Sequence, residues 1–170
     1  NNTAGLSISG TLDINSGTIT ISNSGTAFTI AAGGTVSWSP GTNNLANATL
    51  FTKCTENFAA TSTLIIKKWY DMNVGLGSVI SGSLGNLTIN GVTGPWQMKN
   101  TLQTCSVLGT LTLTSSYIVL DNTGAISNTT LGDIVLTNSN AYVDFFIGSH
   151  PGTFTVNTGN ITINDGELDC

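Results

Sequence analysis

The strongest constraint in this sequence is an alternation of apolar and polar residues that returns along most of the chain. A strand with one buried face shows this period of two, because its successive side chains point to opposite sides of the sheet. The alternating positions are rich in Thr, Ile and Val, which favour strands, and clusters of Gly, Asn and Ser separate them. We therefore predict an all-β fold with more than roughly a third of the residues in strands and no helix beyond two turns. The alternating segments are 6–9, 11–14, 18–21, 86–89, 110–114, 133–136, 153–156 and 160–163.

Two all-β architectures fit this pattern. In a parallel β-solenoid the turns of the chain stack on one another and the sequence repeats at a fixed period. Residues 10–21 do recur as residues 152–163, but these copies lie near the two ends and a non-repetitive middle separates them. A β-sandwich explains this middle better, because its aromatic residues would fill the core between two sheets. We expect the pilin-like or immunoglobulin-like sandwich, with the parallel β-solenoid as the alternative. The aromatic residues expected in the core are Trp38, Trp69, Trp96, Phe145 and Phe146.

Charge is scarce: only 8% of the 170 residues are charged, the cations are four Lys with no Arg, and the net charge is −5. A nucleic-acid surface or an anionic membrane surface needs clustered Lys or Arg, so neither is an expected partner. No stretch approaches the roughly 18 apolar residues that a membrane span needs. The length suits a single core, and the start at Asn1 leads us to expect an exported, extracellular protein whose signal peptide has been removed.

Side chains suited to catalysis or metal binding are few and scattered. His150 is the only histidine and precedes Pro151 in a predicted turn, without a nucleophile motif. Asp165, Glu167 and Asp169 alternate, so a strand would place them on one face, but they lack the staggered ligands of a calcium loop. We expect no enzyme activity, no catalytic residue, no metal site and no bound cofactor.

Two kinds of covalent modification are expected. Cys170 is predicted to form a disulfide with either Cys54 or Cys105, since an ordered chain end needs a tether and no CxxC motif indicates a metal or redox site. Asn-x-Ser/Thr sequons could carry N-linked glycans if the host glycosylates exported proteins. We expect sugar on at least two of the four sequons at Asn47, Asn86, Asn128 and Asn160. A fifth sequon, at Asn1, is the least favoured.

The N-terminal stretch is apolar on one face, through the residues Leu6, Ile8, Leu12 and Ile14. An exposed apolar strand is an aggregation hazard unless it completes a sheet, and donating it to a neighbouring molecule achieves this. We therefore predict a donor strand and hinge over residues 1–16, followed by a sandwich domain over residues 17–170.

The Asn1 start, the alternating stretch 5–21, the many Asn-x-Thr triplets and the low charge resemble the glycosylated archaeal thread pilins. This resemblance implies a subunit of an extracellular filament that polymerises head to tail by donor-strand complementation, with identical subunits as partners and a role in adhesion or biofilm formation. Segments 83–91, 94–96 and 108–114 are similar instead to secreted bacterial adhesin repeats, which implies a β-solenoid segment of a cell-surface adhesin. Two further alternatives are an ice-binding face, suggested by Thr110, Thr112 and Thr114, and an enzyme with converging acids.

Overall fold

The computed structural model describes residues 5–15, 19–20, 26–39, 51–52, 54–67, 82–90, 95–97, 105–114, 117–119, 129–144 and 156–169. Most of these residues lie in strands and none of them lies in a helix, which confirms the predicted all-β class. Every strand pair among the described residues is parallel. Parallel pairing fits the solenoid alternative, since immunoglobulin-like sandwiches consist of antiparallel sheets.

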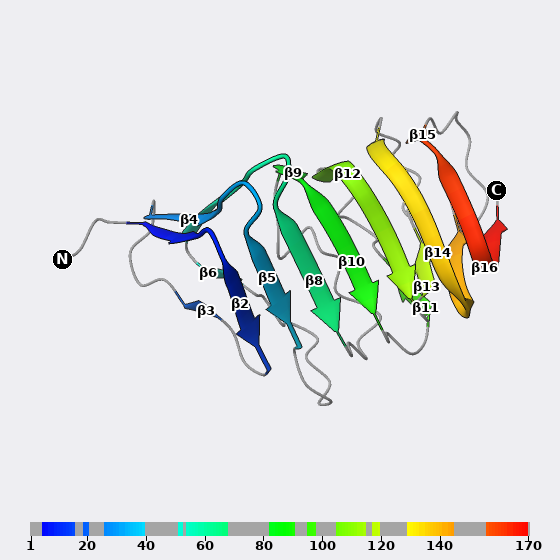
Figure 1. The fold of residues 1–170 in the computed structure, drawn as a ribbon, viewed down its shortest axis with the longest axis horizontal. Helices are drawn as coiled ribbons and strands as arrows, with labels where there is room; N and C mark the ends of the chain where they lie inside the picture. Colours follow the sequence, from blue (N-terminus) through cyan, green and yellow to red (C-terminus); the bar gives the residue numbers. More distant parts are fainter. Residues whose placement is uncertain are drawn as a thin grey trace.

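Seven strands, which we call the rungs, lie side by side in chain order (Figure 1). The ladders pair Thr11 with Thr35, Thr35 with Thr63 and Thr63 with Asn86, and the pattern continues to the last rung. Each residue thus pairs with one that lies 23 to 28 residues further along the chain. The rungs are β2 (Thr11–Ile14), β5 (Thr35–Trp38), β8 (Thr63–Lys67), β10 (Asn86–Asn90), β12 (Cys105–Thr114), β14 (Thr129–Asp144) and β16 (Ile161–Asp169).

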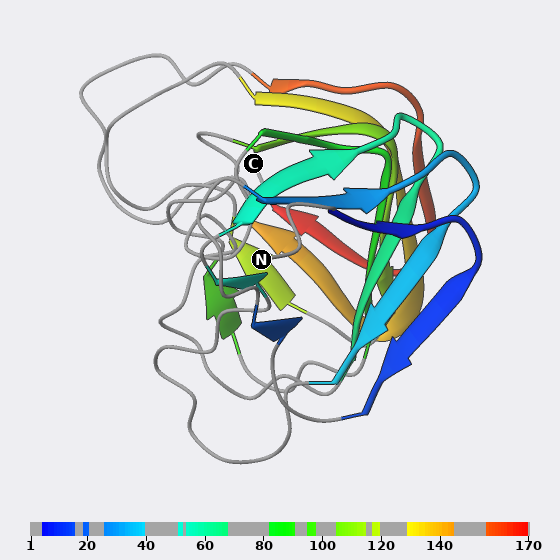
Figure 2. The ribbon, with the colours of Figure 1, turned by 90° about the vertical axis from the view of Figure 1, so that its left-hand side faces the viewer.

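Nine further strands of the described part of the chain, of two to five residues each, flank the rungs on both sides in sequence. Those that precede a rung pair with one another or with the first residues of β12 and β14, and Figure 2 shows β4 running into the corner from which β5 begins. The preceding strands are β1 (Leu6–Ile8), β4 (Thr26–Ile30), β7 (Cys54–Phe58), β9 (Gly82–Leu84) and β15 (Val156–Asn157). The strands that follow a rung are β3 (Ile19–Thr20), β6 (Phe51–Thr52), β11 (Pro95–Gln97) and β13 (Tyr117–Val119).

A column of small residues occupies the corner of each turn, just before most of the rungs and inside the long strands β12 and β14. Backbone hydrogen bonds tie the rungs together there, with 2.8 Å between the Thr35 nitrogen and the Gly10 oxygen and 2.7 Å between the Asn86 nitrogen and the Ser62 oxygen. A Cβ on Gly85 would overlap the carbonyl oxygen of Ser62, so the chain can pass this close to Ser62 only because residue 85 is a glycine. We call this set the corner column: Gly10, Gly34, Ser62, Gly85, Gly109, Gly132 and Gly159.

The core consists of two apolar columns that run through the rungs, together with side chains from the preceding strands. Because successive residues of a strand face opposite sides, the second and fourth residues after each corner point inward. In the five middle rungs all of these residues are buried. The first column is Val36, Leu64, Leu87, Leu111 and Ile134, and the second is Trp38, Ile66, Ile89, Leu113 and Leu136.

The predicted aromatic core can be compared with the structure at one position. Trp38 is fully buried in β5, as expected. Trp96 lies in β11, and Trp69, Phe145 and Phe146 lie outside the described residues.

Candidate interaction surfaces

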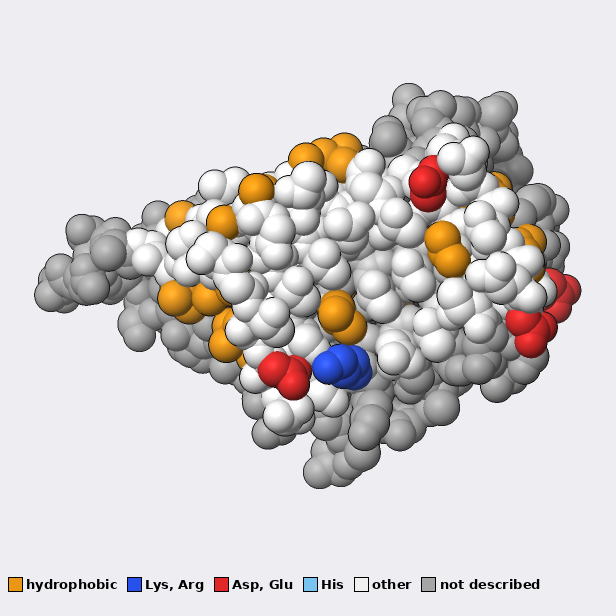
Figure 3. All heavy atoms as spheres, viewed as in Figure 1, with side chains coloured by type: hydrophobic (Ala, Val, Ile, Leu, Met, Phe, Trp, Pro, Cys, Tyr) orange, Lys and Arg blue, Asp and Glu red, His pale blue; other side chains and the backbone are white. Residues whose placement is uncertain are grey.

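The outer surface of the rungs is polar and nearly uncharged. On β10 and β12 the outward positions carry Asn86, Thr88 and Asn90 beside Thr110, Thr112 and Thr114. Figure 3 shows this face as mostly uncharged polar side chains and backbone, with few charged or apolar groups. The Thr ladder noted in the sequence therefore lies on a wide polar face, but Val135 and Asp133 interrupt it on the next rung.

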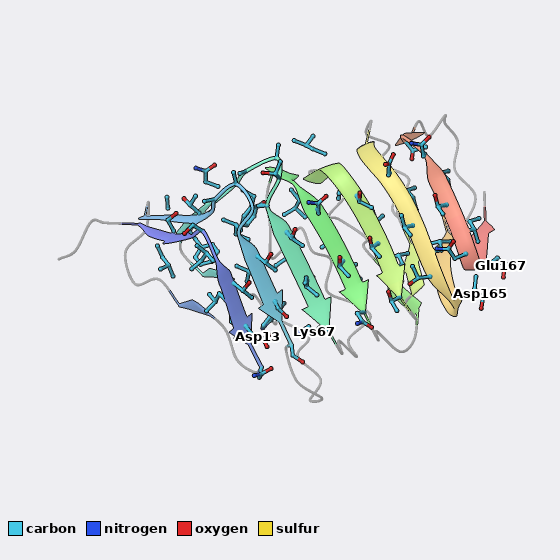
Figure 4. All side chains as sticks on the ribbon, viewed as in Figure 1. Asp13, Lys67, Asp165 and Glu167 are labelled. Carbon is cyan, nitrogen blue, oxygen red and sulfur yellow. The ribbon has the colours of Figure 1, made fainter. Side chains whose placement is uncertain are left out.

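One ion pair crosses this face near its N-terminal end. Lys67 Nζ on β8 lies 3.6 Å from Asp13 Oδ1 on β2, so the pair spans the intervening strand β5 (Figure 4). Ser37 of β5 pairs with Asp13 on one side and Ile65 on the other. This residue is only 3% exposed, and its hydroxyl has no hydrogen-bond partner. A partly exposed ion pair contributes about 1 kcal/mol or less, so it adds little to stability.

Asn86 links three rungs through its side-chain amide. Its Nδ2 donates to the Ser62 carbonyl oxygen at 3.2 Å, and its Oδ1 accepts from the Thr110 backbone nitrogen at 2.9 Å. Asp133 provides the equivalent acceptor two rungs on, where its Oδ1 accepts from the Asn160 backbone nitrogen at 2.8 Å. Both side chains follow the corner column directly, so they supply an acceptor where the chain turns into the rung.

The predicted glycan acceptors have different surroundings in the structure. Asn160 is exposed, although its Nδ2 lies 3.3 Å from Asp133 Oδ1. A glycan on Asn86 would be attached to the Nδ2 that donates to Ser62. Asn47 and Asn128, like Asn1, lie outside the described residues. Glycosylation stays a prediction at all of these positions.

The predicted donor strand contributes β1 and β2, which pair with strands of their own chain. Leu6 pairs with Phe28 and Ile8 with Ile30, while Leu12 pairs with Val36. Residues 6–14 thus belong to the same sheets as strands of the predicted domain over residues 17–170. Among the described strands, β1 and β2 each have a neighbour on one side only. The structure contains a single chain, so donation to a neighbour stays a prediction, as does the boundary at residue 16.

Large apolar side chains are exposed at the two ends of the row of rungs. Leu6 is 43% exposed at the N-terminal end, where Leu12 and Ile14 are half-buried. Ile161 and Ile163 are 40% and 46% exposed at the C-terminal end. These rung residues belong to the columns that are fully buried in the middle of the row.

The described residues bring together no cluster suited to catalysis or metal binding. Asp165 and Glu167 are both exposed on β16, on either side of Gly166, and Figure 4 shows them at the C-terminal end of the row. Within the described part of the chain, no three His, Cys, Asp or Glu side chains are grouped as metal ligands would be. His150 and Cys170 lie outside this part, and the backbones of Cys54 and Cys105 belong to β7 and β12, so the disulfide stays a prediction.

No protein-family model, curated protein or solved structure matches this chain. A search of the described residues for a helix of the length and apolarity needed to cross a membrane finds none.

Proposed function

We propose that this chain is a non-enzymatic structural protein of the cell surface, built as a parallel β-solenoid that forms a rod-like segment of an extracellular adhesin. The observation that carries the proposal is the register of the rungs. Seven strands pair in parallel and in chain order, each with the strand one turn of chain later. Such pairing is the defining contact of a stacked repeat protein, in which each turn contacts mainly its neighbours.

The side chains support the solenoid over the sandwich. The corner column consists of small residues and the two inward columns consist of apolar residues in every rung. This is expected when each turn repeats the environment of the previous one. In a sandwich, the core residues of one sheet would instead face a second sheet about 10 Å away.

The surface supports a structural role outside the cell. The outer face of the rungs offers hydroxyl and amide groups with little charge, which suits a solvated spacer, and the chain carries several glycan sequons. Adhesion would then depend on repeated polar contacts along a rigid face, without a catalytic centre.

Removing one whole turn of chain tests the architecture. Deletion of residues 86–109 joins Gly85 to Thr110 and leaves the corner column and both apolar columns in phase. We expect this variant to fold and to unfold cooperatively in urea, with a lower free energy of unfolding because one turn is lost. Deletion of residues 86–97 removes half a turn and serves as the control, which should not fold. If both deletions abolish folding equally, the solenoid is wrong.

The location of the protein is a separate test. Antibodies against the folded chain should label intact cells of the producing organism, and immunogold electron microscopy should place the label on surface appendages or on the outer envelope. Labelling that appears only after the cells are permeabilised would contradict the proposal.

A second candidate is the filament subunit that polymerises by donor-strand complementation, favoured by the exposure of Leu6 in the short strand β1. This candidate requires β1 of one chain to pair with β4 of another. Chains carrying Ser7→Cys can be mixed with chains carrying Thr29→Cys, since Ser7 and Thr29 are ladder partners. A disulfide between positions 7 and 29 of different chains, mapped by mass spectrometry, would support donation. A bridge that forms only within a chain carrying both substitutions would exclude it.

A further inference from the structure

Both ends of the row of rungs are open edges among the described strands. β2 pairs only with β5, and β16 pairs only with β14. An open edge presents backbone N–H and C=O groups that are available to another strand. β2 and β16 run in the same direction, because every ladder between them is parallel.

The unpaired backbone N–H and C=O groups at the two ends occur at complementary positions along their strands. In a parallel ladder, alternate residues direct both backbone groups to the same neighbour. The Ile134 nitrogen donates to the Asn160 oxygen, so Ile161 and Ile163 direct their groups away from β14. At the other end, the Thr35 nitrogen donates to the Gly10 oxygen, so Thr11 and Asp13 direct their groups away from β5.

The side chains at the two ends also continue one another. Residues 159–164 read Gly-Asn-Ile-Thr-Ile-Asn and residues 10–15 read Gly-Thr-Leu-Asp-Ile-Asn, and both begin in the corner column. Placing the second segment after the first would set Leu12 beside Ile161 and Ile14 beside Ile163. It would also set Asp13 beside Thr162, so no like charges would lie directly opposite each other.

We propose that β16 of one chain pairs in parallel with β2 of a second copy, in the register that joins consecutive rungs within the chain. This inference rests on the proposed solenoid and deepens it, since it names the partner and the contact that would extend the rod. The second copy is the favoured occupant because the described strand β2 has the strand direction, the unpaired backbone groups and the apolar column that would continue β16. The contact is head to tail, so it leaves a free end on each copy and does not close.

Sedimentation velocity of the 170-residue chain over a wide concentration range tests the contact. We expect the wild-type chain to form dimers and longer species as its concentration rises. Ile163→Lys places a charge in the apolar column, and Thr11→Pro removes the outward N–H of an edge strand at a position that tolerates proline. Each change should raise the apparent dissociation constant about tenfold or more.

The matched control is Leu108→Lys, which makes the same kind of change at a side chain that is 50% exposed in the middle of the row. It should leave the association unchanged. Circular dichroism and urea unfolding should show that the compared variants are folded. If Ile163→Lys does not fold, Thr11→Pro tests the same contact from the other end.

Mixing the two end variants distinguishes this contact from any symmetric one. Ile163→Lys chains keep an intact β2 end and Thr11→Pro chains keep an intact β16 end, so the mixture should form dimers but no longer species. A wild-type chain that stays monomeric throughout, or an association that Leu108→Lys weakens as much as the end variants, would overturn the proposal. Neither result would affect the whole-turn deletion test, which depends only on contacts within one chain.

Discussion

At the scale of single residues, the corner column sets how closely the chain can turn into each rung. A Cβ added to Gly85 would overlap the Ser62 carbonyl oxygen and would lie 2.7 Å from the carbonyl oxygens of Ala59 and Ala60. All three are backbone atoms, which cannot move aside as a flexible side chain can. Gly10 is the first member of the same column, and a Cβ added to it would meet nothing within 4 Å.

Gly85→Ala and Gly10→Ala therefore form a matched pair. We expect Gly85→Ala to lower the free energy of unfolding by about 1–3 kcal/mol or more, because the corner must open to admit the methyl group. Gly10→Ala should be neutral or slightly stabilising, since alanine restricts the unfolded chain. Urea denaturation measures both changes, and equal losses would show that the close approach at Gly85 is not what stabilises the corner.

Ser37 provides a second test at this scale, because its buried hydroxyl has no partner. An unsatisfied buried polar group costs about 1–3 kcal/mol. Ser37→Ala should therefore leave stability unchanged or raise it by about 1 kcal/mol in thermal or urea unfolding. Ser39→Ala, at a half-buried position two residues further along the chain, is the control and should change stability by no more than about 0.5 kcal/mol. A clear loss on Ser37→Ala alone would mean that the hydroxyl does have a partner in solution.

At the scale of the strands, amide and carboxylate side chains accept hydrogen bonds from backbone N–H groups at the corners that lead into the rungs. Asn86 joins β8, β10 and β12, and Asp133 provides the equivalent acceptor between β14 and the residue before β16. The acceptor oxygen is common to both residues, whereas only Asn86 also donates.

This difference predicts graded effects at position 86. Asn86→Ala leaves the Thr110 N–H without its acceptor and should lower the free energy of unfolding by about 1–3 kcal/mol. Asn86→Asp keeps the acceptor and should lower it less, as judged by the same urea titration. Thr88→Ala, on the same face of β10, is the control for loss of an outward polar side chain. Equal losses for the two Asn86 variants would show that the donor to Ser62 matters more than the acceptor.

Much of the strand content could be predicted from the alternation, but the pairing of the strands could not. Predicted segments coincide with β2, β10 and parts of β12, β14 and β16. The rung β8 was missed because its alternation is broken: Leu64, Ile65 and Ile66 are consecutive apolar residues. The rung β5 was missed although Thr35-Val36-Ser37-Trp38 does alternate over its four residues. The available signal was the short motif of a small residue followed by Thr or Asn and an apolar residue, which occurs at the corner of every rung except that of β14, where Asp133 follows Gly132.

The repeat itself was hidden by loops of unequal length. Consecutive rungs lie 23 to 28 residues apart, so a search at a fixed period aligns few of them. The recurrence seen in the sequence aligns Gly10 with Gly152, whereas the ladders place Gly10 and Gly159 in one column. The open ends of the row could not be inferred either, since they depend on which strands pair.

At the scale of the whole molecule, burial is greatest in the middle of the row and decreases toward both ends. Leu111 on β12 is fully buried, whereas Leu12 and Ile161 occupy the same column with part of their surface open to solvent. In a stacked protein the terminal repeats have only one neighbour and are the first to open.

Leu111→Ala should therefore lower the free energy of unfolding by about 2–5 kcal/mol, and Leu12→Ala by clearly less. Both values are measured on dilute protein by chemical denaturation. If head-to-tail pairing occurs, the loss on Leu12→Ala should grow with protein concentration, because the second copy then buries this side chain. Equal losses at low concentration would contradict the gradient of burial.

The direction of the ladders has a mechanical consequence. The hydrogen bonds join each rung to the next, so they lie roughly along the row, and a pull on the two ends of the chain loads the rungs one after another. An end rung would peel away before the middle ones and release 24 to 28 residues, or about 80–100 Å of extended chain. A molecule held between two surfaces would then behave as an extensible tether that lengthens in steps under tension and shortens as the rungs re-form.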